Sequence, residues 1–173
     1  DEFVDLVRFM TELGKEGAYK TKTNRFARQW EVLPEGSPNP GTIHHYGAKM
    51  FTQEFSGYKW SPFYAMVGGG IPVEELPSAL KRRAEKYQVL RTHIEVEKPG
   101  IHKMRLEGDL SQMNLFLGKV QIELPAKGQV ADLLIDCKTA GRQHLLLVRQ
   151  GTSSSGQFSL EARSEDMNMV NTF

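Results

Sequence analysis

The chain has a single cysteine among its 173 residues and no apolar run long enough to cross a bilayer. One cysteine excludes an internal disulfide and any zinc site built from several thiolates. Charge of one sign is also missing, since 22 Lys and Arg residues nearly cancel 21 Asp and Glu residues. No overall field therefore attracts nucleic acid or an anionic membrane, and the sequence predicts neither a nucleic-acid partner nor a membrane span.

What the chain has instead is alternation of apolar and polar side chains. From Leu90 to Val96 every second residue is apolar or Thr, and the charged or polar Arg91, His93 and Glu95 lie between them. This period of two is typical of a half-buried strand. We expect strands near residues 87–97, 101–107, 113–117, 119–124, 130–137, 143–149 and 157–163. Seven short strands separated by Gly-rich or Pro-rich turns predict an antiparallel β-sandwich or jelly roll.

Two turn-linked features within these strands give finer predictions. If Pro99-Gly100 forms a tight hairpin, His102 faces Glu97 across it. Cys137 ends the strand 130–137 on the same face as Leu133 and Ile135. We therefore expect Cys137 to be a buried structural thiol, because an unpaired cysteine packs as a small apolar residue.

The first residues predict a different element, an amphipathic helix over 1–13. Its apolar stripe consists of Phe3, Leu6, Val7, Met10 and Leu13. Asp1 can cap its start and Gly14 can end it. Because an isolated helix of this length is only marginally stable in water, we expect it to dock on another surface. A first strand is expected at 28–33.

No pattern in the sequence predicts a catalytic or metal site. The histidines (His44, His45, His93, His102 and His144) lack the spacing of a zinc or copper site. No Ser lies in the Gly-flanked elbow that is typical of hydrolase nucleophiles. A phosphate loop requires Lys-Ser or Lys-Thr after its glycines, and neither follows Gly68-Gly69-Gly70. Asp132 and Asp136 could join Asp109 or Glu107 around calcium, but a solvated strand face is the simpler interpretation.

Aromatic residues are the remaining candidates for ligand contact. Tyr58, Trp60, Phe63 and Tyr64 lie within seven positions. They can either cover one end of the sandwich or stack against sugar rings. Burial of Tyr58, Trp60 and Tyr64 predicts a role in docking, whereas exposure of two of them on one sheet face predicts sugar binding.

Parts of the chain resemble the large planctomycete-type haem-binding proteins. The resemblance is carried by DLVRFMTELGK at 5–15, by Arg28-Gln29-Trp30-Glu31-Val32-Leu33, and by WSPFYAMVGG at 60–69 with IPVEELP at 71–77. In that family a c-type cytochrome domain precedes such a segment. The resemblance implies that 1–16 is the terminal helix of a cytochrome-like domain, and that the location is extracytoplasmic, either periplasmic or secreted.

The C-terminal part is similar to carbohydrate-binding-like sandwiches of the protective-antigen type. The similarity lies in Leu115-Phe116-Leu117-Gly118-Lys119 and in GRQHLLLV at 141–148. The haem attachment motif Cys-x-x-Cys-His is absent, so this segment binds no haem covalently, and haem c is expected only in an upstream domain.

These observations lead to two hypotheses. The first is a non-catalytic accessory sandwich that docks a haem-binding, electron-transfer protein to a cytochrome c-type domain or to other subunits of a complex. The alternative is a carbohydrate-binding module for extracellular polysaccharide. We expect residues 17–86 to hold a linker and the first strands, 87–166 the sandwich core, and 167–173 a tail of a longer polypeptide.

Overall fold

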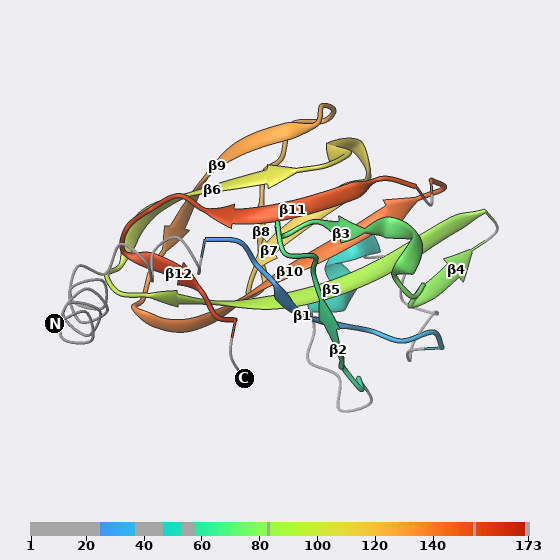
Figure 1. The fold of residues 1–173 in the computed structure, drawn as a ribbon, viewed down its shortest axis with the longest axis horizontal. Helices are drawn as coiled ribbons and strands as arrows, with labels where there is room; N and C mark the ends of the chain where they lie inside the picture. The colour runs from blue at the N-terminus through green and yellow to red at the C-terminus, as the bar shows by residue number, and fades with distance from the viewer. Residues whose placement is uncertain (1–24, 37–46, 53–57, 83, 154, 172–173) are drawn as a thin grey trace, which may run out of the picture.

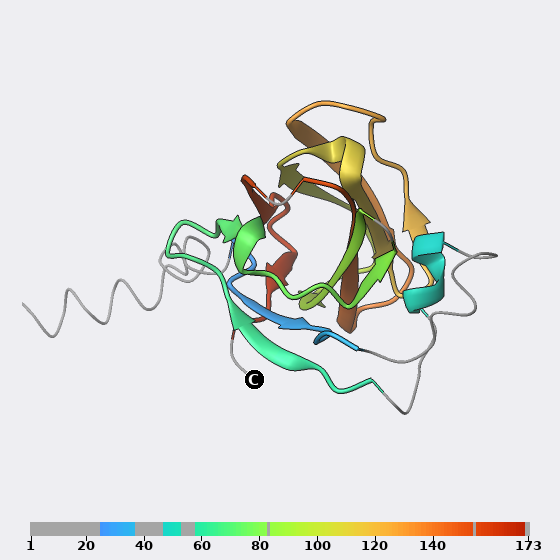
Figure 2. The ribbon, with the colours of Figure 1, turned by 90° about the vertical axis from the view of Figure 1, so that its right-hand side faces the viewer.

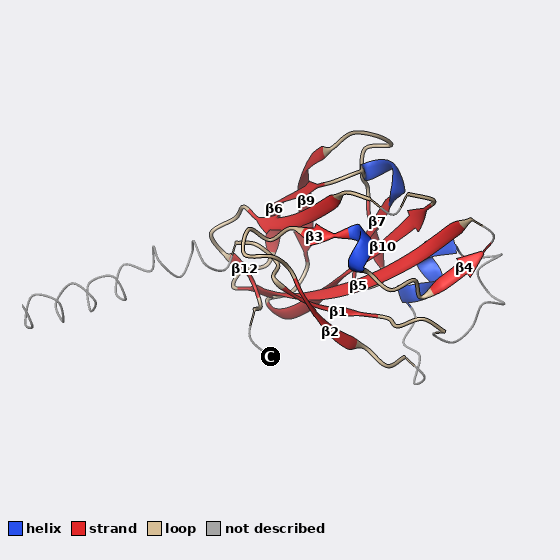
Figure 3. Ribbon diagram, turned by 45° about the vertical axis from the view of Figure 1, so that its right-hand side comes forward, coloured by secondary structure: helices blue, strands red, loops and turns tan. Residues whose placement is uncertain are grey.

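The computed structural model describes residues 25–36, 47–52, 58–82, 84–153 and 155–171. The predicted docking helix, with Phe3, Leu6, Val7, Met10 and Leu13, lies outside the described residues. Strands make up nearly all of the regular structure, and the described helices are short 3-10 turns (Figure 3). Among the described residues, none of these helices has the length and apolar character that crossing a bilayer requires.

Two antiparallel sheets form the predicted sandwich (Figure 1). The large sheet follows the order β2-β1-β5-β10-β7-β8, and β4 and β12 also pair with β5. Its strands are β1 (Gln29–Val32), β2 (Ser61–Tyr64), β4 (Leu80–Arg82), β5 (Glu85–Val96), β7 (Met113–Leu117), β8 (Val120–Ile122), β10 (Gly141–Gly151) and β12 (Met167–Met169). The small sheet has the order β3-β11-β6-β9, from β3 (Ile71–Pro72), β6 (Gly100–Glu107), β9 (Val130–Cys137) and β11 (Gln157–Ala162).

The main core lies between the inward faces of the two sheets. It includes Trp30, Leu90, Leu115, Leu147 and Leu160, each at most 1% exposed. Alternation along each strand delivers these side chains to one side, because neighbouring residues of a strand point to opposite faces. The expected thiol is confirmed here: Cys137 is fully buried in this core. Burial raises the pKa of the Cys137 thiol.

The outward face of the large sheet is also partly covered. A second set of buried apolar residues, here the outer cluster, gathers around the 3-10 helix η2 (Gly47–Thr52), which lies outside the strands (Figure 2). Its buried members are Leu33, Ala48, Met50, Phe51, Ala79, Tyr87, Val89, Phe116, Leu146 and Val148. The sequence of β10 is therefore apolar at every position from Leu145 to Val148 instead of alternating, because both faces of the strand are buried there.

Two expectations, one about the connection at 97–99 and one about the C-terminal residues, differ from the structure. Residues 97–99 do not form a hairpin, because β5 belongs to the large sheet and β6 to the small one. His102 is consequently turned inward, 5% exposed, with its Nε2 atom 2.7 Å from the carbonyl oxygen of Lys98 rather than facing Glu97. Residues 167–173, expected as a tail, contain β12, whose Met167 and Met169 are buried against β5.

Replacement of Leu147 by Ala tests the core between the sheets. Leu147 is fully buried on the central strand β10, so the variant leaves a cavity and should lower the free energy of unfolding by about 2–5 kcal/mol. Urea denaturation measures this change. Ile101→Ala is the control, because Ile101 is 68% exposed and its loss should change stability by less than about 0.5 kcal/mol. Equal losses in the two variants would contradict this account of the core.

Candidate functional site: a cleft between two strand edges

A cleft of about 740 Å³ lies at one side of the sandwich. It opens where β8 ends the large sheet and β9 ends the small one. Turns that are far apart in sequence meet there, Leu117 to Val120 from one side and Lys138 to Gly141 from the other. The volume is in the range of pockets that hold small ligands.

The floor of the cleft is apolar because the core is open at this edge. Leu117 and Ile122 are only partly buried, although both pack against the main core. Val120 pairs with Leu117 and therefore points to the same inward face, yet it is 70% exposed. An inward-facing Val exposed to this degree provides an apolar surface that a ligand could cover.

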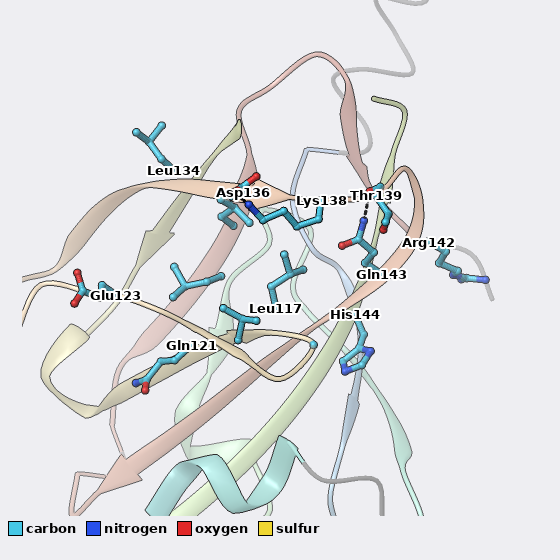
Figure 4. A pocket seen from close by; sticks show the side chains of 14 residues that line it. Leu117, Gln121, Glu123, Leu134, Asp136, Lys138, Thr139, Arg142, Gln143 and His144 are labelled. Atoms are coloured by element: carbon cyan, nitrogen blue, oxygen red, sulfur yellow. Dashed lines mark hydrogen bonds and ion pairs between the residues drawn. The ribbon is translucent and has the colours of Figure 1, made fainter. Parts of the chain in front are cut away.

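The rim of the cleft is polar and carries side chains of positive and of negative charge. Gln143 donates from Nε2 to the carbonyl oxygen of Thr139 at 2.6 Å, which holds the turn before β10 against the strand. Lys138 forms an ion pair with Asp136 on the adjoining wall. In Figure 4, Leu117 points into the cleft and Gln143 points toward Thr139, whereas Arg142 points away. An apolar floor below side chains that can form hydrogen bonds suits a ligand with one apolar and one polar side.

Of the aromatic residues singled out by sequence, Tyr58, Trp60 and Tyr64 lie elsewhere, on the outward side of the large sheet near β1 and β2. Tyr58 and Trp60 pack against the outer cluster and meet edge to face, with ring centroids 6.3 Å apart. The Arg91 guanidinium lies 4.2 Å from the Trp60 ring centroid and also pairs with Glu31 at 3.0 Å. Both aromatic rings are half-buried, and burial raises the pKa of Tyr58.

Tyr64 differs from these two residues, because it is 66% exposed. It lies on β2 opposite Gln29 of β1, and its neighbour Phe63 packs against the main core. Alternation therefore places Tyr64 on the outward face of the large sheet. The structure brings Tyr58 and Trp60 together and leaves Tyr64 as the exposed aromatic of the three.

Two histidines lie side by side on the same face, where His93 of β5 pairs with His144 of β10. Burial is the main cause of a lowered pKa at His93. The cations Arg91 and Arg142 lower it further, and Glu31 acts in the opposite direction. His93 thus resists protonation within the folded chain.

The acidic residues considered for calcium are engaged separately. Asp132 accepts from Arg105 Nε at 2.9 Å, and Asp136 pairs with Lys138. The hydrogen bond from Arg105 is the main cause of a lowered pKa at Asp132. Within the described part of the chain, no group of three or more His, Cys, Asp or Glu side chains is arranged to hold a metal ion.

One buried charge was not singled out by sequence. Arg149 is 2% exposed and donates to Gln88 Oε1 at 2.7 Å, to Gln112 Oε1 at 3.1 Å and to the carbonyl oxygen of Ser153 at 2.6 Å. Desolvation lowers the pKa of Arg149. Because these three protein acceptors engage both terminal nitrogens of the guanidinium, Arg149 ties the turn after β10 to the core.

No family model matches the sequence. No curated protein matches it either. Solved structures with some similarity include a family 35 carbohydrate-binding module from an environmental isolate, with 11% identity and a TM-score of 0.37 over 49% of this chain and 70% of that one. A β-glucosidase from Kluyveromyces marxianus has 9% identity and a TM-score of 0.45, over 79% of this chain and 14% of the enzyme.

A β-glucuronidase from Ruminococcus gnavus has 11% identity and a TM-score of 0.48, over 82% of this chain and 29% of the enzyme. The chain therefore spans less than a third of the length of either glycosidase. At these identities and TM-scores none of the properties of those proteins transfers to this chain.

The lowered pKa of His93 makes a pH dependence of stability testable. Since the folded chain binds a proton at His93 less readily than the unfolded chain, acidification favours unfolding. We expect the free energy of unfolding to fall as pH drops below the ordinary histidine pKa of about 6.5. His93→Gln should remove part of that fall in urea denaturation at a series of pH values. The same pH dependence in both proteins would refute the prediction.

Proposed function

We propose that this chain is a non-catalytic carbohydrate-binding module and that the cleft between β8 and β9 holds the sugar. The amphipathic lining of the cleft is the observation that carries the proposal. A pyranose ring has C–H groups on its faces and hydroxyls around its edge. Its apolar face would cover Val120 and Leu117, and its hydroxyls would meet the Gln143 amide and the Asp136–Lys138 pair.

The charges of the rim favour a ligand without large net charge. Asp136 is balanced by Lys138, and both side chains are more than half exposed. Solvated groups of this kind exchange hydrogen bonds with water for hydrogen bonds with a ligand at little desolvation cost. The hydroxyl groups of a neutral molecule can accept from the Lys138 ammonium and donate to the Asp136 carboxylate. A simple anion or cation can interact favourably with only one of these two groups.

A binding role is proposed rather than catalysis because the cleft does not hold the usual features of a glycosidase centre. Glycosidases use a pair of carboxyl groups, one of which is desolvated so that it can donate a proton. In the cleft, Asp136 is 52% exposed and ion-paired, and Glu123 is exposed. The accessory role beside a cytochrome domain and the extracytoplasmic location stay predictions from the sequence resemblance.

A charge placed on the floor of the cleft tests the proposal. Val120→Asp should lower affinity for the bound glycan at least about tenfold, because the carboxylate would have to be desolvated beneath the ring. Val120 is 70% exposed, so the variant should fold. Binding is measured first on an array of plant, algal and bacterial polysaccharides and then by calorimetry.

Val130→Asp is the matched control, since Val130 is 51% exposed and lies at the opposite end of β9 from Asp136, outside the cleft. It introduces the same charge and should leave affinity unchanged. The absence of binding to every polysaccharide of the array would refute the carbohydrate-binding function. Release of reducing sugar from a bound polysaccharide would refute its non-catalytic character.

A further inference from the structure

A row of four side chains crosses the outward face of the large sheet from the cleft to the exposed aromatic residue. His144 lines the cleft and pairs with His93. Gln29 pairs with Tyr64 at the far side of the sheet. Glu31 of β1 pairs with Arg91 of β5, and the same antiparallel register continued by two residues sets Gln29 beside His93. We refer to His144, His93, Gln29 and Tyr64 as the outer row.

The outer row is continuous and partly open to solvent. His144, His93 and Gln29 are half-buried, and Tyr64 is 66% exposed. Three steps between neighbouring strands separate β10 from β2, which is about 14 Å. A ligand lying along the row would therefore run across the strands and be longer than a single sugar ring.

The chemistry of the row matches hydroxyl groups. Imidazole and amide side chains both donate and accept hydrogen bonds. Gln29 Oε1 is buried without a hydrogen-bond partner among the described residues. A buried acceptor of this kind costs free energy unless water or a ligand reaches it. The Gln29 side chain is partly exposed, so a small rotation would turn its Oε1 atom toward a ligand lying on the outer row. The exposed ring of Tyr64 then offers a stacking surface at the end.

We propose that the ligand is an extended polysaccharide, bound with one unit in the cleft and further units along the outer row as far as Tyr64. This inference rests on the proposed carbohydrate-binding function and adds the length and direction of the ligand. On this proposal, the module binds along several consecutive units of a polysaccharide rather than recognising a free monosaccharide or disaccharide.

The test uses ladders from disaccharide to octasaccharide made from cellulose, xylan and mannan. Calorimetry with the intact chain should show affinity rising with length until the outer row is filled. Tyr64→Ala should lower affinity for the longest oligosaccharides about fivefold and leave disaccharide affinity unchanged. Tyr64→Phe should retain affinity for the long ligands, since it keeps the ring. Ile101→Ala, at a similarly exposed position on the small sheet, is the control.

The outcomes separate this inference from the function on which it rests. Length-dependent affinity that Tyr64→Ala removes supports the outer row. Affinity independent of length and of Tyr64 would overturn the outer row while leaving the cleft as the sugar site. Equal losses for disaccharides and octasaccharides in Tyr64→Ala would also overturn it, because the cleft alone should hold the short ligands. Failure of every ladder to bind, together with the absence of binding on the polysaccharide array, would overturn both proposals.

Discussion

The pairing of β5 with β10 is the contact on which the rest of the structure depends. Their register runs without interruption from Lys86 opposite Gly151 to Val96 opposite Gly141. Both strands bury residues on two faces, in the main core and in the outer cluster. Apolar residues alone would fix this register weakly, because a slip exchanges one apolar face for another. Polar residues fix it: a slip by one position would turn Arg91 and His93 into the main core, where each would lose solvation without a partner.

That register also explains why the cleft and the outer row meet. Gln143 and His144 are consecutive on β10, so their side chains point to opposite faces of the large sheet. Gln143 belongs to the inward face and the cleft, and His144 pairs with His93 on the outward face. The cleft exists because β8 is short and the small sheet ends at β9, which leaves Val120 uncovered between two strand edges. The proposed ligand, filling this gap, would reach the outer row by passing the end of β10 that carries Gln143 and His144.

Sequence alternation predicted the sandwich and several strand boundaries, since 113–117 and 130–137 are the observed β7 and β9. It could not find β3, β4 or β12, because two or three residues carry no measurable period and their pairing is decided by distant strands. The cleft was not predictable for a similar reason. The turns near Gly118 and Gly141 were both recognisable, but their meeting depends on which strand ends each sheet. The sequence showed that the aromatic residues near Trp60 lie close together along the chain. It did not show which of them would be packed against the outer cluster and which would be exposed.

The position of Arg91 bears on which aromatic residue is open to the proposed ligand. A guanidinium over a Trp ring contributes about 0.5–1 kcal/mol at an exposed site and more when it is desolvated. Arg91 also donates to Glu31 from both Nε and Nη2, so moving it away from Trp60 would disrupt a second interaction. A sugar stacking on that face of Trp60 would have to replace both. Tyr64, beyond Gln29 on the edge strand β2, presents its ring without that cost, and it is therefore the side chain at which a chain crossing the sheet would end.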